Sequence, residues 1–313
     1  MKAQLSAEAV EFGRNVQAAI RELGGIDAVR KADERPAARA TEVERVLKSL
    51  GMWDLRPLND QVELEAAAAA CRGAGWHALA YPLAERLAAP PEAEALMVVG
   101  PGRSVAPHAD LPLRWAAVDP RGNRLTVLRT GPLLLTNLGP FVAEVEVEPR
   151  AETLPRDTAL VLNLQIWWLT GLLERCVAMT RQHMTERHQF GRSLAVNQGL
   201  QFMVTEAVVA VRGVVELAKH TSWSISRVDR ERHWLVDATG LRLAGLEAAE
   251  TVLRIAHQIH GAIGFCHEHD LSWLSRLSQS VRRLPLSKSQ TEELLLEMMT
   301  EVGYDGIFPL EAD

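Results

Sequence analysis

A short β-rich segment lies between two long helical segments, and this order limits the folds open to the chain. Residues 92–153 contain short β-branched or alternating runs, such as Leu96 to Val99 and Phe141 to Val147, separated by turns rich in Gly and Pro. Val145 and Val147 alternate with glutamates, which predicts a strand with one face in water. We therefore expect a small antiparallel β domain over residues 92–153.

The segment before it, residues 1–91, has the periodicity of helices. Apolar positions recur at helical spacing in Val10 to Leu23 and in Ala40 to Leu50, and Gly51 is placed to end the second of these helices. Trp76 to Ala89 is expected to form another helix before a Pro-Pro pair closes this part. The sequence predicts an N-terminal helical domain.

The segment after it, residues 154–313, is almost entirely helical in pattern. Asp157 or Thr158 is expected to cap a long helix. Leu200 to Ala218 has apolar residues at steps of three and four, and another helix is expected from about Glu231 to His260. The fold class predicted is mainly α with a small β subdomain, ending in a C-terminal four-helix bundle.

Composition excludes several classes of function. The net charge of -6 over 313 residues, with no block of basic residues, argues against nucleic acid as a partner. Three distant cysteines without a CxxC pair fit a reducing cytosol. The N-terminus lacks an apolar signal core, and the most apolar helix, around Ala159 to Leu173, is too short to span a bilayer. We expect a cytoplasmic protein with no membrane partner.

Two motifs in the last third of the chain carry the functional signal. Glu186-Arg-His-Gln-Phe-Gly-Arg-Ser-Leu194 with Gln198 resembles the RxQFGxxLxxxQ signature of acyl-CoA dehydrogenases. Gln258-Ile-His-Gly-Ala-Ile-Gly-Phe265, continuing to Arg276, resembles the second signature of that family, QxHGGxGFxxExxLxxxxR. Their order and separation also match, so the chain resembles the acyl-CoA dehydrogenase family.

The resemblance implies a site for FAD shared across a subunit interface. An Arg fork suits a diphosphate, amides hydrogen-bond the cofactor, an aromatic side chain packs beside it, and glycines let the backbone approach closely. The cofactor-binding residues expected from the resemblance are Arg187, Phe190, Gln198, Gln258, Gly261 and Gly264.

The sequence also departs from the family. Residues 95–150 lack the TEPxxGSD and WIT stretches that hold the flavin ring, so the chain is not expected to bind the isoalloxazine unaided. The family's two positions for the catalytic glutamate fall near Pro285 and near Val161, and neither is a carboxylate. Asp157 is interpreted as a helix cap and Glu174 as a surface charge. The second glycine of the QxHGGxGF part of the second signature is replaced by Ala262 in this chain.

These losses resemble the degenerate subunit of bacterial α2β2 heterotetrameric acyl-CoA dehydrogenases that act on steroid-CoA substrates. The resemblance implies a subunit of an enzyme that forms an α,β-enoyl-CoA, with the base supplied by a second acyl-CoA dehydrogenase subunit. An acyl-CoA substrate and an electron-transfer acceptor are the other partners implied. Two alternatives stay open: a scaffold subunit without FAD, and a self-sufficient flavoenzyme with an unusual base.

A metal site is considered and disfavoured. His257 and His260 lie three apart on one expected helix, with His267 and His269 following. No Glu-x-x-His pair from a second helix accompanies them, so no metal is expected.

Overall fold

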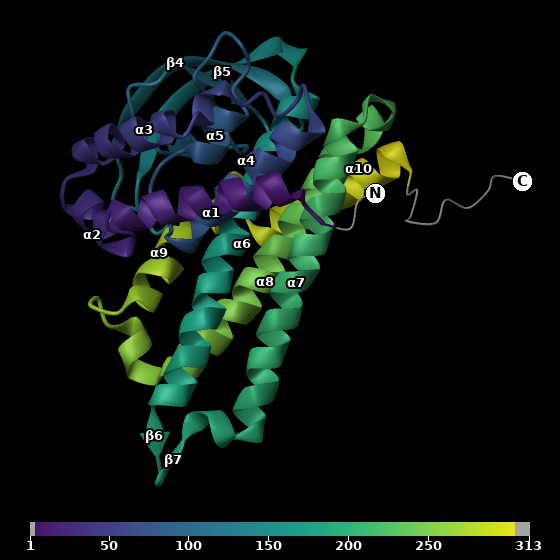
Figure 1. The fold of residues 1–313 in the computed structure, drawn as a ribbon. Coiled ribbons are helices and arrows are strands. Elements are labelled where there is room, and N and C mark those ends of the chain that lie inside the picture. The colour runs from purple at the N-terminus through teal and green to yellow at the C-terminus, as the bar shows by residue number, and fades with distance from the viewer. Residues whose placement is uncertain (1–3, 304–313) are drawn as a thin grey trace, which may run out of the picture.

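A computed structural model describes residues 4–303. It has a broad head, which contains the N-terminal helices and the sheet, and a narrow stalk of long helices (Figure 1). The predicted order of helices, small sheet and helices is confirmed. Within residues 4–303, no helix is both long and apolar enough to cross a bilayer.

Five helices form the N-terminal part of the head: α1 Ala7–Glu22, α2 Ile26–Glu34, α3 Arg39–Ser49, α4 Gln61–Trp76 and α5 Leu83–Leu87. Gly51 follows α3 in the left-handed conformation, as predicted for its helix end. The prediction of one helix over Trp76 to Ala89 is wrong. Ala78 has a φ of 51°, which leaves the helical region, and Pro82 precedes the separate short helix α5.

The sheet has five strands in the order β1-β3-β4-β5-β2. Their bounds are β1 Ala95–Val98, β2 Val105–Pro107, β3 Trp115–Val118, β4 Asn123–Leu133 and β5 Val142–Thr153. The expectation of a purely antiparallel sheet is wrong, because β1 and β3 pair in parallel. The chain leaves β1, forms β2 at the opposite edge and returns beside β1 in the same direction. The alternation in β5 is confirmed: Val145 is buried between the exposed Glu144 and Glu146.

Three long helices form the stalk: α6 Pro155–Glu186, α7 Gln198–Ser226 and α8 Trp234–His260. α9 Asp270–Arg283 packs against α6, and α10 Lys288–Val302 packs against α8. The predicted cap of α6 is wrong, since Leu154 holds the N-cap position without a side-chain bond. Asp157 lies in the first turn, and Thr158 bonds back to the Leu154 carbonyl at 2.7 Å.

Head and stalk meet where α4 crosses α6 at two glycines. A Cβ at Gly75 would lie 1.8 Å from the Trp168 carbonyl oxygen, and one at Gly171 would lie 1.9 Å from that of Arg72. The two backbones are therefore in direct contact, which only glycine allows. One hydrophobic cluster runs through this crossing from Val16 to Leu277. The division at residues 91 and 153 stays a prediction.

Candidate functional site

The first motif lies at the far end of the stalk. α6 ends at Glu186, and Arg187 begins a hairpin of two short strands, β6 His188–Gln189 and β7 Arg192–Ser193 (Figure 1). Phe190 stands at the turn of this hairpin with a φ of 53° and is 100% exposed. An aromatic side chain held in the left-handed region and fully in solvent has no role in the core of this chain.

The second motif reaches the same end of the stalk. His260, the last residue of α8, stacks on His183 of α6 with ring centroids 4.4 Å apart. Arg187 follows His183 by one turn, and its N–H donates to the His183 carbonyl at 2.9 Å. Gly261 follows His260 with a φ of 62° and no atom within 4 Å of where a Cβ would lie. Arg187 and Gly261 therefore lie at the ends of the neighbouring helices α6 and α8, at the same end of the stalk.

The two predicted glutamines lie on the adjoining helices. Arg254 of α8 pairs with Glu206 of α7 at 3.3 Å, which fixes how far these helices overlap. Gln258 lies one turn beyond Arg254, and Gln198 lies two turns before Glu206. Both glutamines therefore lie toward the hairpin end of the stalk. Gln198 and Gln258 are exposed.

Gly264 differs from the other predicted residues because it is buried. A Cβ there would come within 3.0 Å of the His260 Cβ and 3.2 Å of Leu271. Close packing of the short 3-10 helix η5 Gly261–Phe265 against α8 and α9 therefore explains the glycine. Phe265 is 71% exposed and stacks on His257 at 4.4 Å.

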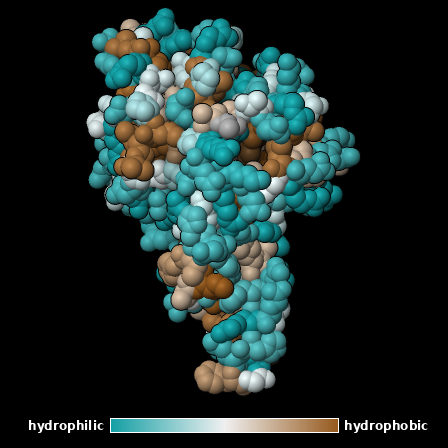
Figure 2. All heavy atoms as spheres, turned by 90° about the vertical axis from the view of Figure 1, so that its left-hand side faces the viewer, coloured by the Kyte–Doolittle hydropathy of each residue, from teal (hydrophilic) through white to brown (hydrophobic). Residues whose placement is uncertain are grey.

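Large apolar side chains are exposed at this end. Phe190, Val196, Phe202, Ile263 and Phe265 are each at least half exposed. Figure 2 shows hydrophobic residues along one face of the stalk and at its tip. Scattered apolar residues are normal on a surface, but a group of aromatic residues around one helix end marks a binding surface.

The residues at the stalk end fit a dinucleotide. The side chains of Arg187, Gln198 and Gln258 have no hydrogen bond or ion pair to any part of residues 4–303, so their donors are available to a ligand. Gly261 leaves open space beside the backbone. An unpaired guanidinium, two free amides and an open glycine turn are the groups that bind a diphosphate.

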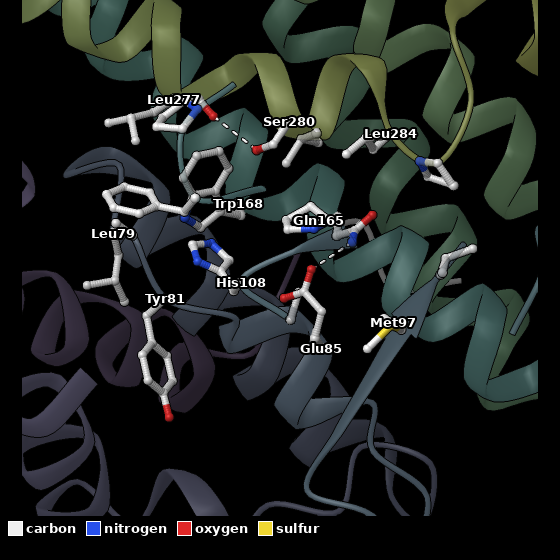
Figure 3. Close-up of a pocket in the computed structure, with 18 residues that line it drawn as sticks. Leu79, Tyr81, Glu85, Met97, His108, Gln165, Trp168, Leu277, Ser280 and Leu284 are labelled. Atoms are coloured by element: carbon white, nitrogen blue, oxygen red, sulfur yellow. Dashed lines mark hydrogen bonds between the residues drawn. The ribbon is translucent and has the colours of Figure 1, made fainter. Parts of the chain in front are cut away.

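A second candidate site lies where the head meets the stalk. A cavity of about 50 Å³ is bounded by the turn around Leu79, by α5, by β1, by α6 and by α9 (Figure 3). Trp168 and Leu284 narrow it, and Pro285 lines it. This volume holds roughly three to five water molecules.

The cavity contains one carboxyl group, that of Glu85. The Gln165 amide Nε2 donates to Glu85 Oε1 at 2.8 Å, and the two side chains point toward each other (Figure 3). Burial raises the pKa of the Glu85 carboxyl, while the bond from Gln165 opposes that rise. Gln165 Oε1 and His108 Nδ1 are buried without a partner in the described chain. Burial, followed by the charge of Arg39, holds the pKa of His108 well below its usual range.

The two positions at which the resemblance implies a catalytic base carry no carboxylate in this chain. Pro285 lines the cavity and Val161 is fully buried, so neither supplies a proton acceptor. Glu174 is partly exposed and forms a 2.5 Å ion pair with Arg72. Glu85 was not among the predicted site residues. The available signal was an acidic residue, beside Arg86, in a short helix directly after Pro82.

The histidines near the second motif contact aromatic rings. His260 and His269 lie 5.0 Å apart edge to face, and His267 contacts Trp273 at 4.7 Å. Within residues 4–303 no group of three or more His, Cys, Asp or Glu side chains has the geometry to hold a metal ion.

Comparison with known proteins finds similarity within the C-terminal part of the chain. Residues 164–287 match the acyl-CoA dehydrogenase C-terminal domain. Two curated relatives are acyl-CoA dehydrogenase IpdE2 of Mycobacterium tuberculosis, 31% identical over 32% of this chain and 29% of its own length, and 3-sulfinopropanoyl-CoA desulfinase of Paraburkholderia xenovorans, 29% identical over 34% of this chain and 26% of its own length. The matched region thus spans under a third of these relatives.

Solved structures match nearly the whole chain. The ChsE4-ChsE5 complex from Mycobacterium tuberculosis contains a chain with a TM-score of 0.75 at 15% identity, covering 96% of this chain and 99% of that one. A steroid ACAD, Tcur3481-Tcur3483, gives a TM-score of 0.74 at 14% identity, covering 95% and 99%. At this identity the likeness establishes the fold, and the predicted fold class is confirmed.

Proposed function

We propose that this chain, whose residues 164–287 match the acyl-CoA dehydrogenase C-terminal domain, is a subunit of a FAD-dependent enzyme that converts an acyl-CoA to an α,β-enoyl-CoA. In this proposal the chain binds part of the FAD, and a partner subunit supplies the catalytic base. The observation that carries the proposal is the contrast between its two sites. The stalk end is open and rich in unpaired donors, whereas the cavity near Pro285 has a volume of only about 50 Å³.

At the stalk end, Arg187 would neutralise a diphosphate while Gln198 and Gln258 hydrogen-bond the dinucleotide. Phe190 would pack beside it, and the turn at Gly261 would let the backbone approach. These groups face solvent, away from the 50 Å³ cavity, so a cofactor bound by them would lie between this chain and another. FAD, when bound, supplies the acceptor for the hydride that leaves the β-carbon of the substrate.

The small cavity supports a non-catalytic role for this chain. A pocket for a small organic ligand has about 300–1,000 Å³, well above the volume beside Pro285. Trp168 and Leu284 line this region. A subunit without room for an acyl group of its own leaves substrate binding to its partner.

The similar structures support the partner and substrate classes. One is a complex of two named chains, and another is described as a steroid ACAD. An electron transferring flavoprotein of Acidaminococcus fermentans also shares the fold, with a TM-score of 0.73 at 12% identity. We propose a heterotetramer with a second acyl-CoA dehydrogenase subunit, a steroid or other bulky acyl-CoA as substrate, an electron-transfer acceptor, and a cytoplasmic location.

The test of the proposal is the flavin content of the purified complex. Arg187→Ala should lower the flavin bound per complex, because the diphosphate loses its cationic partner, and should leave the assembly intact in gel filtration. Arg129→Ala, on exposed strand β4 of the head, is the matched control and should keep full flavin content. Equal flavin content in both variants would remove Arg187 from the cofactor site.

A second candidate function follows from Glu85. This chain could be a self-sufficient flavoenzyme in which the Glu85 carboxylate removes the substrate α-proton, since burial raises the pKa of this carboxyl and makes its carboxylate a stronger base. The rate at which acyl-CoA reduces the bound flavin in the absence of oxygen distinguishes the self-sufficient enzyme from the partner-base proposal. The partner-base proposal predicts bleaching at the wild-type rate in Glu85→Gln, and loss of bleaching favours Glu85.

A further inference from the structure

A cleft bounded by α1, the end of α4, α6 and α9 is lined by three arginines. We define the arginine cleft by Arg14 and Arg21 of α1, Trp76 and His77 at the end of α4, Arg175 of α6, and Asp270 of α9. Its volume is about 590 Å³, within the range of small-molecule sites. Neither of the two proposed sites uses these residues.

The cleft carries excess positive charge in a chain whose net charge is -6. The side chains of Arg14 and Arg21 have no hydrogen bond or ion pair to any described residue. The carboxylate in the lining, Asp270, is already bonded at 2.7 Å by Arg30, and Arg175 lies farther from it at 3.6 Å. Three guanidiniums thus face one concave space whose carboxylate is already engaged.

The positive charges of the cleft also act on His77. Burial lowers the pKa of its imidazole first, and the charges of Arg175 and Arg21 lower it further. The ring therefore stays neutral near pH 7. It packs against Gly25, where α2 begins without a side-chain cap, so the first turn of that helix adds partial positive charge to the rim.

The spacing of the arginines indicates more than one anionic group on the ligand. Arg14 and Arg21 are seven residues apart on α1, which places their Cα atoms about 10 Å apart along the helix axis. A single phosphate group is too small to contact the side chains of Arg14 and Arg21 near their Cβ atoms and, at the same time, Arg175 across the cleft. The remaining volume, walled by Trp76, has room for an organic group.

We propose that the arginine cleft binds a small organic diphosphate of about nucleotide size, with Arg14, Arg21 and Arg175 contacting its phosphates. Arginine is suited to this because its planar fork of donors matches phosphate oxygens. The ligand would lie against α1, α4, α6 and α9 together, beside the crossing of head and stalk. The site is separate from the stalk end, where Arg187 is proposed to contact FAD.

Titration calorimetry of the full chain with ADP tests this inference, with adenosine as the uncharged probe. ADP should bind and adenosine should not. The double variant Arg14→Gln/Arg21→Gln should weaken ADP binding by at least about tenfold, and added salt should weaken it in the wild type. Both side chains are exposed and unpaired, so the variant should retain its helical circular dichroism. Arg21→Gln alone gives a milder change if the double variant does not fold.

A control variant fixes the location of the bound ADP. Arg45→Gln, an exposed arginine on α3, should leave ADP binding unchanged. The inference is overturned if ADP does not bind, if adenosine binds equally well, or if Arg14→Gln/Arg21→Gln binds ADP as tightly as the wild type.

Discussion

The Gln165 amide on α6 donates a 2.8 Å hydrogen bond to the buried carboxyl of Glu85 on α5. This bond joins the stalk to the head at the small cavity near Pro285. The Gln165 oxygen beside it has no partner, so the pair is a buried polar contact with one group unsatisfied. The cost of such a pair depends on whether Glu85 carries a charge.

Glu85→Gln should make stability less dependent on pH. Burial raises the pKa of Glu85 above its ordinary value of 4.5, so the unfolded chain loses this proton at a lower pH than the folded chain. Wild-type stability therefore falls as pH rises through that window. A glutamine oxygen accepts the same bond without charge, so the variant should melt a few degrees above wild type at pH 8 and level with it near pH 4. An equal difference at both pH values would contradict this.

Gly75→Ala and Gly171→Ala should each destabilise the chain by about 3 kcal/mol, since a methyl group would force α4 and α6 apart. Gly213→Ala is the matched control, because this exposed glycine on α7 has no atom near its Cβ position. It should stabilise the chain by about 0.5–1 kcal/mol. Urea unfolding measures all three. A crossing that tolerates alanine would show that head and stalk do not depend on this contact.

Acid should loosen the contact between α6, α8 and the loop before α9. Burial lowers the pKa of His260 to about 4, with a smaller effect from His183 and His269. The unfolded imidazole titrates near 6.5, so stability present above that pH is lost as pH falls toward 4. His260→Asn should flatten this loss of a few degrees in melting temperature. The exposed His188→Asn should retain the wild-type profile, and a similar flattening there would exclude the buried cluster as the cause.

Phe190→Asn should separate folding from cofactor binding. The side chain is fully exposed and its φ of 53° suits asparagine, so the free energy of unfolding of the lone chain should change by less than about 0.5 kcal/mol. The flavin content of the complex should fall. Leu128→Asn, a half-exposed position on β4, should leave flavin content unchanged. Equal loss in both variants would point to general surface effects.

The sequence predicted the elements whose pattern is local. Periodicity in Leu200 to Ala218, alternation around Val145, and Gly51 at a helix end depend on neighbours within a few residues, and all three hold. The prediction over Trp76 to Ala89 failed because propensity does not report the left-handed Ala78 or the turn before Pro82. The parallel pairing of β1 with β3 depends on β2 pairing at the far edge, which local pattern does not encode.

The candidate sites also differ in how far local sequence pattern predicted their residues. The motifs brought Arg187, Gln198, Gln258 and Gly261 to one end of the stalk because each lies at or near the end of a predicted helix. Glu85 was missed because its role comes from Gln165, eighty residues away in the sequence. Gly264 carried a motif signal, yet its immediate constraint is packing against His260.

The visible absorption spectrum tests the central claim, that this chain holds only part of a flavin site. The chain should be purified alone and again after co-expression with the acyl-CoA dehydrogenase-like product of a neighbouring gene. The account predicts a colourless lone chain and a yellow complex. A yellow lone chain would contradict it in favour of a self-sufficient flavoenzyme, and a colourless complex would contradict it in favour of a scaffold without FAD.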